Sequence, residues 1–280
     1  LARTPVSVGV IATPRAGGGR ATQKEINVIG TMQLLAACQR AESVTKLIVK
    51  STAGVYGSSP RDPAMFTEDM SAKRMPGSGW ARDSVEVEGY VRGLSRRRED
   101  IEITTLRFAN VIGPRIRTAF TDHFSLPVIP IPFGFDARLQ FVHEDDCVAA
   151  IARAVSLPGL GAVNVAGDGI ITVSQAANIA GRPYVLVPRM ATGSITDLAK
   201  RFGLMDIGSD QVDLLSFGRG LDTRRMREDL GFEPAYTTRA AYEDFARATK
   251  GRVLDRLPFA QPGWTAVQAA EAAMRAVTPT

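Results

Sequence analysis

The sequence has few cysteines, no long hydrophobic run and no signal-like start, and each shortage excludes a class of protein. Cys38 and Cys147 are the only cysteines among 280 residues, so they cannot build a disulfide framework and they fit a reducing compartment. The most apolar stretch, residues 126–135, is interrupted by prolines, whereas a transmembrane helix needs about 18 consecutive apolar residues. The N-terminus shows no basic segment followed by a long apolar region, which would mark a secretory signal. We therefore expect a cytoplasmic protein with no membrane span.

The excess of one sign of charge over the other is also small. The 34 basic and 29 acidic residues leave a net charge of +5 at pH 7, and the densest basic run, Arg96 to Arg98, is followed at once by two acidic residues. That arrangement is typical of a solvated helix end, whereas a nucleic-acid surface would carry more charge with interleaved aromatic side chains. We expect no nucleic-acid partner, and phosphate-bearing small molecules remain compatible with this composition.

The His-Glu-Asp-Asp run at residues 143–146 could be mistaken for a metal cluster. These residues straddle a predicted strand-to-helix junction, whereas zinc and calcium need ligands that converge with fixed geometry. Asp145 fits better as the cap of the following helix, and His123 belongs to no recognisable motif. We predict no metal site, and we expect both cysteines to be inert core residues.

Apolar patterning indicates a globular α/β protein. Hydrophobic residues make up 45% of the chain and charged residues 22%, which excludes wholesale disorder. Short runs of β-branched character predict buried strands at residues 6–12, 47–49 and 101–108, and helical spacing predicts helices at about 22–40 and 81–97. Strands joined by helices in this way are typical of βαβ units with a parallel sheet.

The pattern after residue 113 is less regular. We expect short strands at 141–143 and 163–165, and helices at 145–156, 221–230, 238–249 and 264–277. Residues 58–79 are rich in Ser, Gly and Pro and are interpreted as a loop, while residues 184–220 show no clear period.

Six short segments carry a resemblance to a known family. They are NVIGT at 27–31, KSTAGVYG at 50–57, RFANVIGP at 107–114, FVHEDD at 141–146, NVAG at 164–167 and DTRRMREDLGF at 222–232. In order and spacing, over about residues 6 to 245, they resemble the extended short-chain dehydrogenases/reductases, in particular the NAD-dependent epimerases/dehydratases. The resemblance implies a Rossmann-like, doubly wound parallel sheet with a smaller C-terminal α/β substrate lobe.

The same resemblance suggests how the chain divides. Residues 1–115 would be the remainder of the dinucleotide-binding domain. Residues 116–250 would form mainly the substrate lobe, with about 139–166 returning to the first domain, and residues 251–280 would be a helical tail. The homodimers common in the family would use the helices near 22–40 and 81–97.

The segment that opens other members of this family has no counterpart in the sequence. They begin with a strand, a glycine-rich turn and a helix that hold the dinucleotide pyrophosphate, whereas this sequence aligns from their fourth strand. The run Gly17 to Gly19 does not meet the G-x-G-x-x-G spacing, because Thr22 stands where the third glycine would be, and we interpret it as a flexible loop. Our hypothesis is a fragment or a misplaced start, which would leave the strand at 6–12 as an exposed edge.

The family's catalytic pair is replaced in this sequence. The resemblance implies a tyrosine base with a lysine four residues later, because a phenol needs a nearby cation to act as a base at neutral pH. Trp80 and Ser84 occupy those two positions, and an indole is no base and a serine carries no charge. Trp80 either stacks on a ligand ring or is a partly buried packing residue. Asp83 is the local candidate for a base, although a solvated first helical turn is its more ordinary role.

Other site residues are also implied by the resemblance. Thr52 aligns with the Ser/Thr that binds the reacting oxygen; its alternative role is to end a strand by bonding its own backbone. The cofactor-binding residues would be Ala12, Asn27, Ser51, Phe108 and Asn110, with Asn27 at a kink in its helix. The substrate-binding residues would be Arg115 and Arg138, with ordinary surface charge as the alternative. The cofactor would be NAD, and NADP stays open because the residue that selects between them belongs to the segment with no counterpart.

Three interpretations of function follow. The first is a divergent NAD-dependent nucleotide-sugar epimerase/dehydratase, similar to UDP-glucose 4-epimerases, that transfers a hydride transiently at a sugar carbon. The second is a binding or regulatory protein that keeps the dinucleotide or nucleotide-sugar site and has lost the chemistry, as Trp80 and Ser84 suggest. The third is a non-functional truncated product.

Overall fold

A four-stranded parallel sheet forms the centre of the protein. The computed structural model describes residues 6–10, 24–73, 75–76, 79–188 and 209–250. The strands are β1 (Val6–Val10), β2 (Lys46–Thr52), β3 (Glu102–Phe108) and β8 (Gly161–Val165), in the order β1-β2-β3-β8. Every neighbouring pair is parallel, and within the described ranges β1 pairs with β2 alone. The predicted α/β fold with a parallel sheet is confirmed.

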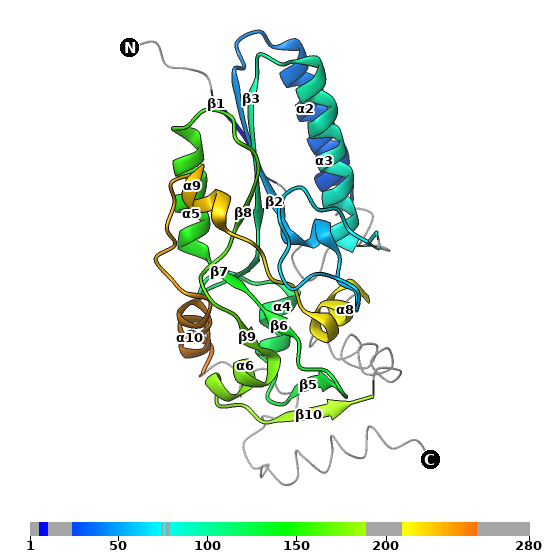
Figure 1. Cartoon of the computed structure of the whole chain (residues 1–280), viewed down its shortest axis with the longest axis vertical. Helices are drawn as coiled ribbons and strands as arrows, with labels where there is room; N and C mark the ends of the chain where they lie inside the picture. Colours follow the sequence, from blue (N-terminus) through cyan, green and yellow to red (C-terminus); the bar gives the residue numbers. More distant parts are fainter. Residues whose placement is uncertain (1–5, 11–23, 74, 77–78, 189–208, 251–280) are drawn as a thin grey trace, which may run out of the picture.

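Helices cover both faces of this sheet (Figure 1). On one face lie η1 (Glu25–Gly30), α2 (Thr31–Arg40) and α3 (Gly79–Arg97). On the other face lie α5 (Glu144–Val155) and α9 (Arg224–Glu228). Side chains alternate along β2, because successive residues of a strand point to opposite faces.

The two cores show this alternation. Leu47 and Val49 pack in one apolar cluster with residues of α2 and α3, whereas Ile48 packs in another with residues of α5 and α9. The sheet is therefore doubly wound.

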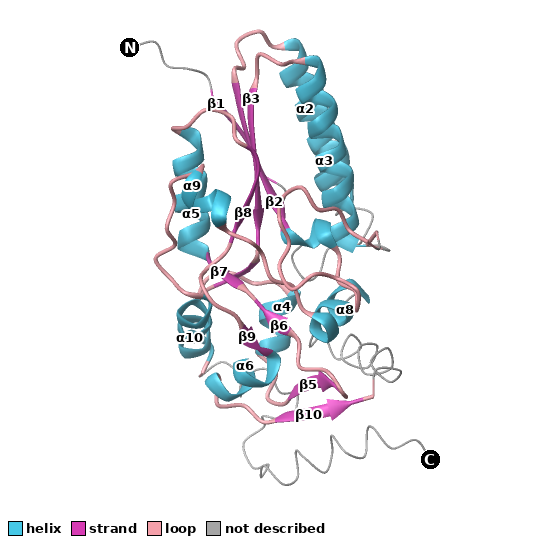
Figure 2. Ribbon diagram, viewed as in Figure 1, coloured by secondary structure: helices cyan, strands magenta, loops and turns pink. Residues whose placement is uncertain are grey.

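A smaller lobe lies below the carboxyl ends of the strands (Figure 2). It consists of β4 (Asn110–Ile112), α4 (Ala119–Phe124), β5 (Ile129–Pro132), β6 (Arg138–Leu139), β7 (Phe141–His143), β9 (Ile171–Thr172), α6 (Val173–Ile179), β10 (Tyr184–Val187), α8 (Ser209–Phe217) and α10 (Thr238–Thr249). Three two-stranded sheets, β10-β5, β4-β7 and β6-β9, stand around its core. Phe124, Phe141 and Tyr242 pack against one another at the centre of that core.

Most predicted elements are present, and the differences have local causes. The helix expected at 238–249 has those bounds, but the one expected at 221–230 covers only Arg224–Glu228. The residues before it are extended, because Arg219 and Leu221 form bridges with Leu139 and Phe66. The tail expected at 264–277 lies outside the described residues. No helix in the described part is long and apolar enough to cross a membrane.

Candidate functional site

Thr52 stands at the carboxyl end of β2, where the chain turns into the 3-10 helix η2 (Ala53–Tyr56). The side chain of Thr52 is buried, and its hydroxyl oxygen accepts a hydrogen bond of 3.0 Å from the backbone N–H of Gly54. The alternative role foreseen for Thr52, ending a strand by bonding its own backbone, is thus present. The hydroxyl proton bonds no group in the part of the chain that the structure describes, so Thr52 keeps a donor for a ligand.

The start of α3 packs directly against η2. A Cβ atom added to Gly54 would lie 3.3 Å from the Cβ of Ala81 and 3.4 Å from the side chain of Thr52. That spacing is tighter than most Cβ contacts, so glycine allows this close approach. The aligned pair Trp80 and Ser84 therefore occupies the helix end that meets the carboxyl end of β2.

Trp80 and Ser84 carry no base and no cation. The Ser84 hydroxyl donates a 2.9 Å hydrogen bond to the Trp80 carbonyl and is fully buried, so it is engaged within its own helix. The Trp80 indole Nε1 is buried and finds no acceptor among the described residues. Trp80 is only partly buried as a whole, and a buried N–H without a partner is costly unless a ligand or water accepts from it.

Asp83 differs from what the sequence suggested. A solvated position in the first turn was the more ordinary role, but Asp83 is the fifth residue of α3 and is 1% exposed. It shares the buried face of α3 with Val87 and Val91, which explains why the helix turns it inward. As the proposed base, Asp83 stays a prediction.

A buried network of charged and polar side chains ties α3 to the sheet. The guanidinium of Arg107 in β3 donates two hydrogen bonds to the Glu88 carboxylate, of 2.7 and 3.1 Å, and one of 2.8 Å to the Tyr56 hydroxyl. Tyr56 donates in turn to Asn164 at 2.7 Å, and Ser51 donates to Glu88 at 2.6 Å. The network joins β2, β3, β8, η2 and α3 directly beside Thr52.

The network also sets the charges of its members. Burial alone would lower the pKa of Arg107, but the hydrogen bonds and charge of Glu88 outweigh it and raise that pKa. Burial raises the pKa of the Tyr56 phenol, so Tyr56 is no base at neutral pH. Sequence reasoning missed Glu88 and Arg107. The available signal was a carboxylate and a guanidinium within otherwise apolar stretches, since buried charges must be paired.

The proposed cofactor-binding residues have different surroundings. Ser51 faces α3 and bonds Glu88, Phe108 is buried in the core shared with α5, and Asn110 is partly exposed at the start of β4. Asn27 is buried in the π-helical η1, a departure from α-helical geometry where the resemblance implied a kink. Ala12 lies outside the described residues.

In the described part of the chain, the two proposed substrate-binding arginines form no hydrogen bond with Thr52. Arg115 pairs with Glu144 at 2.9 Å and with Asp145, both at the start of α5. Arg138 is exposed in β6 beside β9. Both roles remain predictions.

The acidic run after β7 has a structural role. His143, rather than Asp145 as expected, caps α5: its Nδ1 accepts a 3.2 Å hydrogen bond from the Asp145 N–H. The His143 ring also stacks on Tyr236 with centroids 3.8 Å apart, and the Asp146 carboxylate accepts from two backbone N–H groups of the segment before α10. In the described ranges no cluster of side chains has the composition of a metal site.

Comparison with known proteins identifies the family. The model of the NAD dependent epimerase/dehydratase family matches residues 8–166. The chain belongs to this family. The uncharacterized protein Rv0501 of Mycobacterium tuberculosis is 47% identical over 234 residues, which are 84% of this chain and 62% of that protein. The chain thus spans less than two thirds of this relative. The 3-diazoavenalumate denitrifying reductase of a Streptomyces species is 28% identical over 219 residues, 74% of this chain and 66% of that protein.

Solved structures of epimerases share the fold. UDP-glucuronic acid 4-epimerase from Bacillus cereus, in complex with NAD, has a TM-score of 0.63 at 18% identity, over 88% of this chain and 75% of that one. UDP-glucose 4-epimerase from Thermotoga maritima, with UDP-glucose, has a TM-score of 0.60 at 20% identity, over 84% and 72%. At these identities the likeness establishes the architecture of this family member.

Proposed function

We propose that this family member takes part in NAD-dependent conversion of a nucleotide-sugar, by transient hydride transfer at a sugar carbon. The observation that carries the proposal is Thr52, whose buried hydroxyl proton bonds no described group and lies beside the start of α3, in a chain whose family match covers residues 8–166. The solved relatives named above contain NAD or UDP-sugars, which supports this choice of ligands. A cytoplasmic location is part of the proposal.

The described residues fit the reactive end of such a ligand pair. Among the described residues, the Thr52 hydroxyl and the Trp80 indole are two donors without acceptors, and they come from elements that pack against each other. The described ranges contain no glycine-rich turn of the G-x-G-x-x-G type for the pyrophosphate. NAD, when bound, supplies the hydride acceptor.

The chain's own residues would then orient the sugar. The Thr52 hydroxyl would donate to the reacting oxygen, and the Trp80 N–H would donate to a second oxygen of the ligand. A proton must also leave the sugar hydroxyl, and Glu88 is already held by Arg107 and Ser51. As the sequence suggested, we assign the proton to Asp83, which follows Trp80 by three residues in α3.

Binding of the dinucleotide tests the function directly. The purified chain is denatured with acid and the supernatant assayed for released NAD(H) by absorbance, with thermal-shift titration of NAD and UDP-glucose as a second measurement. Bound NAD, or a melting temperature that rises with NAD, is the expected result. A folded chain that responds to neither ligand contradicts the proposal.

The second candidate is a binding protein that has lost catalysis. Ser84 favours it, because its hydroxyl donates to the Trp80 carbonyl. In that case the double change Trp80→Tyr, Ser84→Lys restores a phenol and a cation at the helix end. We expect turnover of UDP-glucose to rise about 100-fold, the lower end of a general acid–base contribution, with the Kd for NAD little changed. Reaction progress is measured by product chromatography.

Ser84→Ala is the matched control, since it removes the same hydroxyl and adds no cation. It is expected to leave turnover at the level of the parent protein. Equal turnover in the parent protein and the folded double variant contradicts the idea that turnover is limited by loss of the tyrosine–lysine pair.

The exposed face of η1 and α2 supports a homodimer. Ile26, Ile29, Met32 and Leu34 are exposed at 59, 43, 44 and 41%, and several exposed large apolar side chains close together in the chain indicate an interaction site. We expect the chain to be a dimer and Ile29→Asp to make it a monomer, because a charge in an apolar interface is desolvated without a partner. Light scattering after gel filtration measures this. Val148→Asp, at a 67% exposed site on α5, is the control and is expected to stay dimeric; a monomeric parent protein contradicts the assignment.

A further inference from the structure

Two lysines lie on the same face of β2. Successive side chains of a strand alternate between the faces of the sheet, so Lys46 and Lys50 share the face of Ile48, which packs with residues of α5. Lys46 lies at the amino end of the strand, where its ammonium group donates to the Leu157 carbonyl at 2.7 Å and pairs with Glu102 at 3.0 Å. The charge of Lys46 is therefore compensated.

Lys50, nearer the carboxyl end of the strand, has no such partner. Among the described residues, its Nζ atom forms no hydrogen bond and no ion pair. Its neighbours in the adjacent strands are the apolar Val10 and Leu106. Burial lowers the pKa of the Lys50 amine, and Cys147 of α5 offsets this only in part. Because a cation withdrawn from water needs a compensating anion, this position suits a negatively charged oxygen of a ligand.

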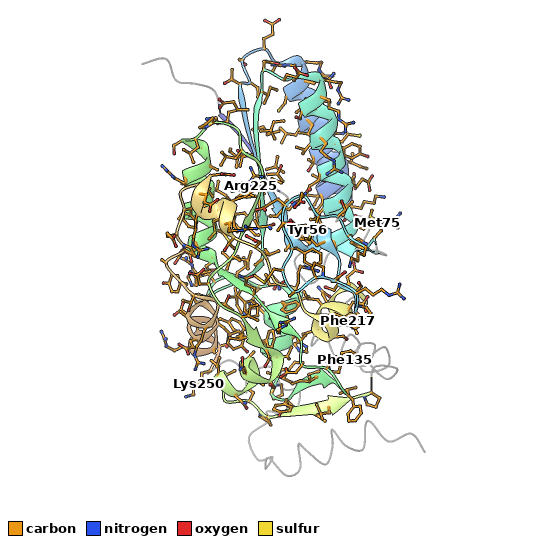
Figure 3. All side chains as sticks on the ribbon, viewed as in Figure 1. Tyr56, Met75, Phe135, Phe217, Arg225 and Lys250 are labelled. Atoms are coloured by element: carbon orange, nitrogen blue, oxygen red, sulfur yellow. The ribbon has the colours of Figure 1, made fainter. Side chains whose placement is uncertain are left out.

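The amine of Lys50 also lies close to Thr52. One residue separates the two in β2, so their side chains leave the same face of the sheet and their Cα atoms are about 7 Å apart. Lys50 is partly exposed, and its flexible four-carbon stem gives the amine reach. Ligands of α/β folds bind at the carboxyl ends of the strands. Figure 3 labels Tyr56 of η2 at this edge, where β2 ends.

We propose that Lys50 is a further catalytic residue, whose ammonium group donates to the same sugar oxygen as Thr52 and supplies the positive charge that Ser84 cannot. This deepens the proposed function and rests on it. In that reaction the hydroxyl proton passes to Asp83 and the sugar carbon loses a hydride to NAD, while the carbon–oxygen bond becomes a carbonyl. Negative charge gathers on the oxygen as the proton leaves, and a fixed cation beside it stabilises that charge without taking part in either transfer.

Removing and rebuilding the amine in the full chain tests the assignment. Lys50→Cys is treated with bromoethylamine, which converts the new thiol into a close analogue of the lysine side chain, while Cys38 and Cys147 are buried. We expect Lys50→Cys to lower kcat for UDP-glucose about 100-fold, as for loss of one donor to a developing oxyanion, with KM little changed. Alkylation is expected to restore most of the lost kcat.

Lys250→Cys is the matched control. Lys250 is exposed at the end of α10, and Figure 3 shows it in the small lobe, well away from Tyr56. This variant is expected to keep the kcat of the parent protein before and after alkylation.

Two further measurements do not depend on turnover. Acetic anhydride acetylates accessible amines, and mass spectrometry follows the reaction at each lysine. UDP-glucose together with NAD is expected to slow acetylation of Lys50 and to leave that of Lys250 unchanged. The melting temperature of Lys50→Cys is expected to be no lower than that of the parent, because the change removes a partly buried charge that no described group compensates.

The role of Lys50 and the proposed function fail in different ways. Lys50 has no catalytic role if Lys50→Cys keeps full kcat, if alkylation recovers none of the loss, if the ligands leave acetylation of Lys50 unchanged, or if the variant melts at a lower temperature. The proposed function stands in each of these cases. A parent protein that does not convert UDP-glucose, whether or not it binds NAD, overturns both.

Discussion

Replacing Glu88 with glutamine is expected to lower the free energy of unfolding by about 3–5 kcal/mol. Glu88 and Arg107 are among the buried residues of the protein and share a bidentate ion pair between α3 and β3. Glutamine has nearly the same shape as glutamate but leaves the guanidinium buried without a counter-charge. Urea unfolding followed by fluorescence, with linear extrapolation to water, measures the change.

A double variant separates the pair from its surroundings. Arg107→Met combined with Glu88→Leu removes both charges, so we expect it to be less destabilised than the sum of the two single variants. Glu243→Gln is the surface control, because it breaks an ion pair with Arg239 that is 41 and 67% exposed, and exposed pairs contribute under about 1 kcal/mol. A Glu88→Gln variant as stable as Glu243→Gln contradicts the importance of the buried pair.

The same network explains how the candidate site keeps its geometry. Ser51 and Tyr56 stand immediately before Thr52 and at the end of η2, and both bond to the Glu88–Arg107 pair. The side chains that would meet a ligand are thus set by a rigid, fully buried connection. Glu88→Gln is therefore expected to disturb ligand binding together with stability.

The sheet and its helices were predictable because their signals are local. Residues 101–108 form a short run rich in β-branched and large apolar side chains that becomes β3, and residues 238–249 repeat apolar side chains with helical spacing that becomes α10. The segment 184–220 had no such period. In β10 the first three of four side chains are exposed, so burial leaves no alternating pattern to detect. Strand β10 is instead held by pairing with β5, which is a long-range contact.

The candidate site was predictable only in part for the same reason. Thr52 belongs to a short segment whose order could be matched to a family, and aligning the helix that follows it placed Trp80 and Ser84. The inward position of Asp83 and the Glu88–Arg107 pair depend on how α3 is rotated against the sheet, which a linear pattern does not specify. Lys50 stood in the same short segment as Thr52, but a linear pattern does not show that its amine would be left without a described partner.

Lowering the pH from 7 to 4 is expected to destabilise the protein through His123, and His123→Phe is expected to remove that effect. His123 in α4 is 1% exposed, its ring stands edge-on to Phe124 with centroids 5.1 Å apart, and neither ring nitrogen has a partner in the described ranges. Burial lowers the pKa of His123 from 6.5 to about 4, whereas in the unfolded chain the imidazole is protonated near its ordinary pKa.

The sign follows from proton binding. Between pH 6.5 and pH 4 the unfolded state binds a proton at His123 that the folded state does not, so the free energy of unfolding falls as the pH falls. The full difference between the two pKa values corresponds to about 3 kcal/mol. Phenylalanine fits the aromatic surroundings and carries no proton. Urea unfolding at several pH values between 7 and 4 gives both profiles, and because the two proteins share every other titratable group, the difference between the profiles isolates His123. Profiles that stay parallel across this range mean that the folded protein gives His123 a proton acceptor or a path to water.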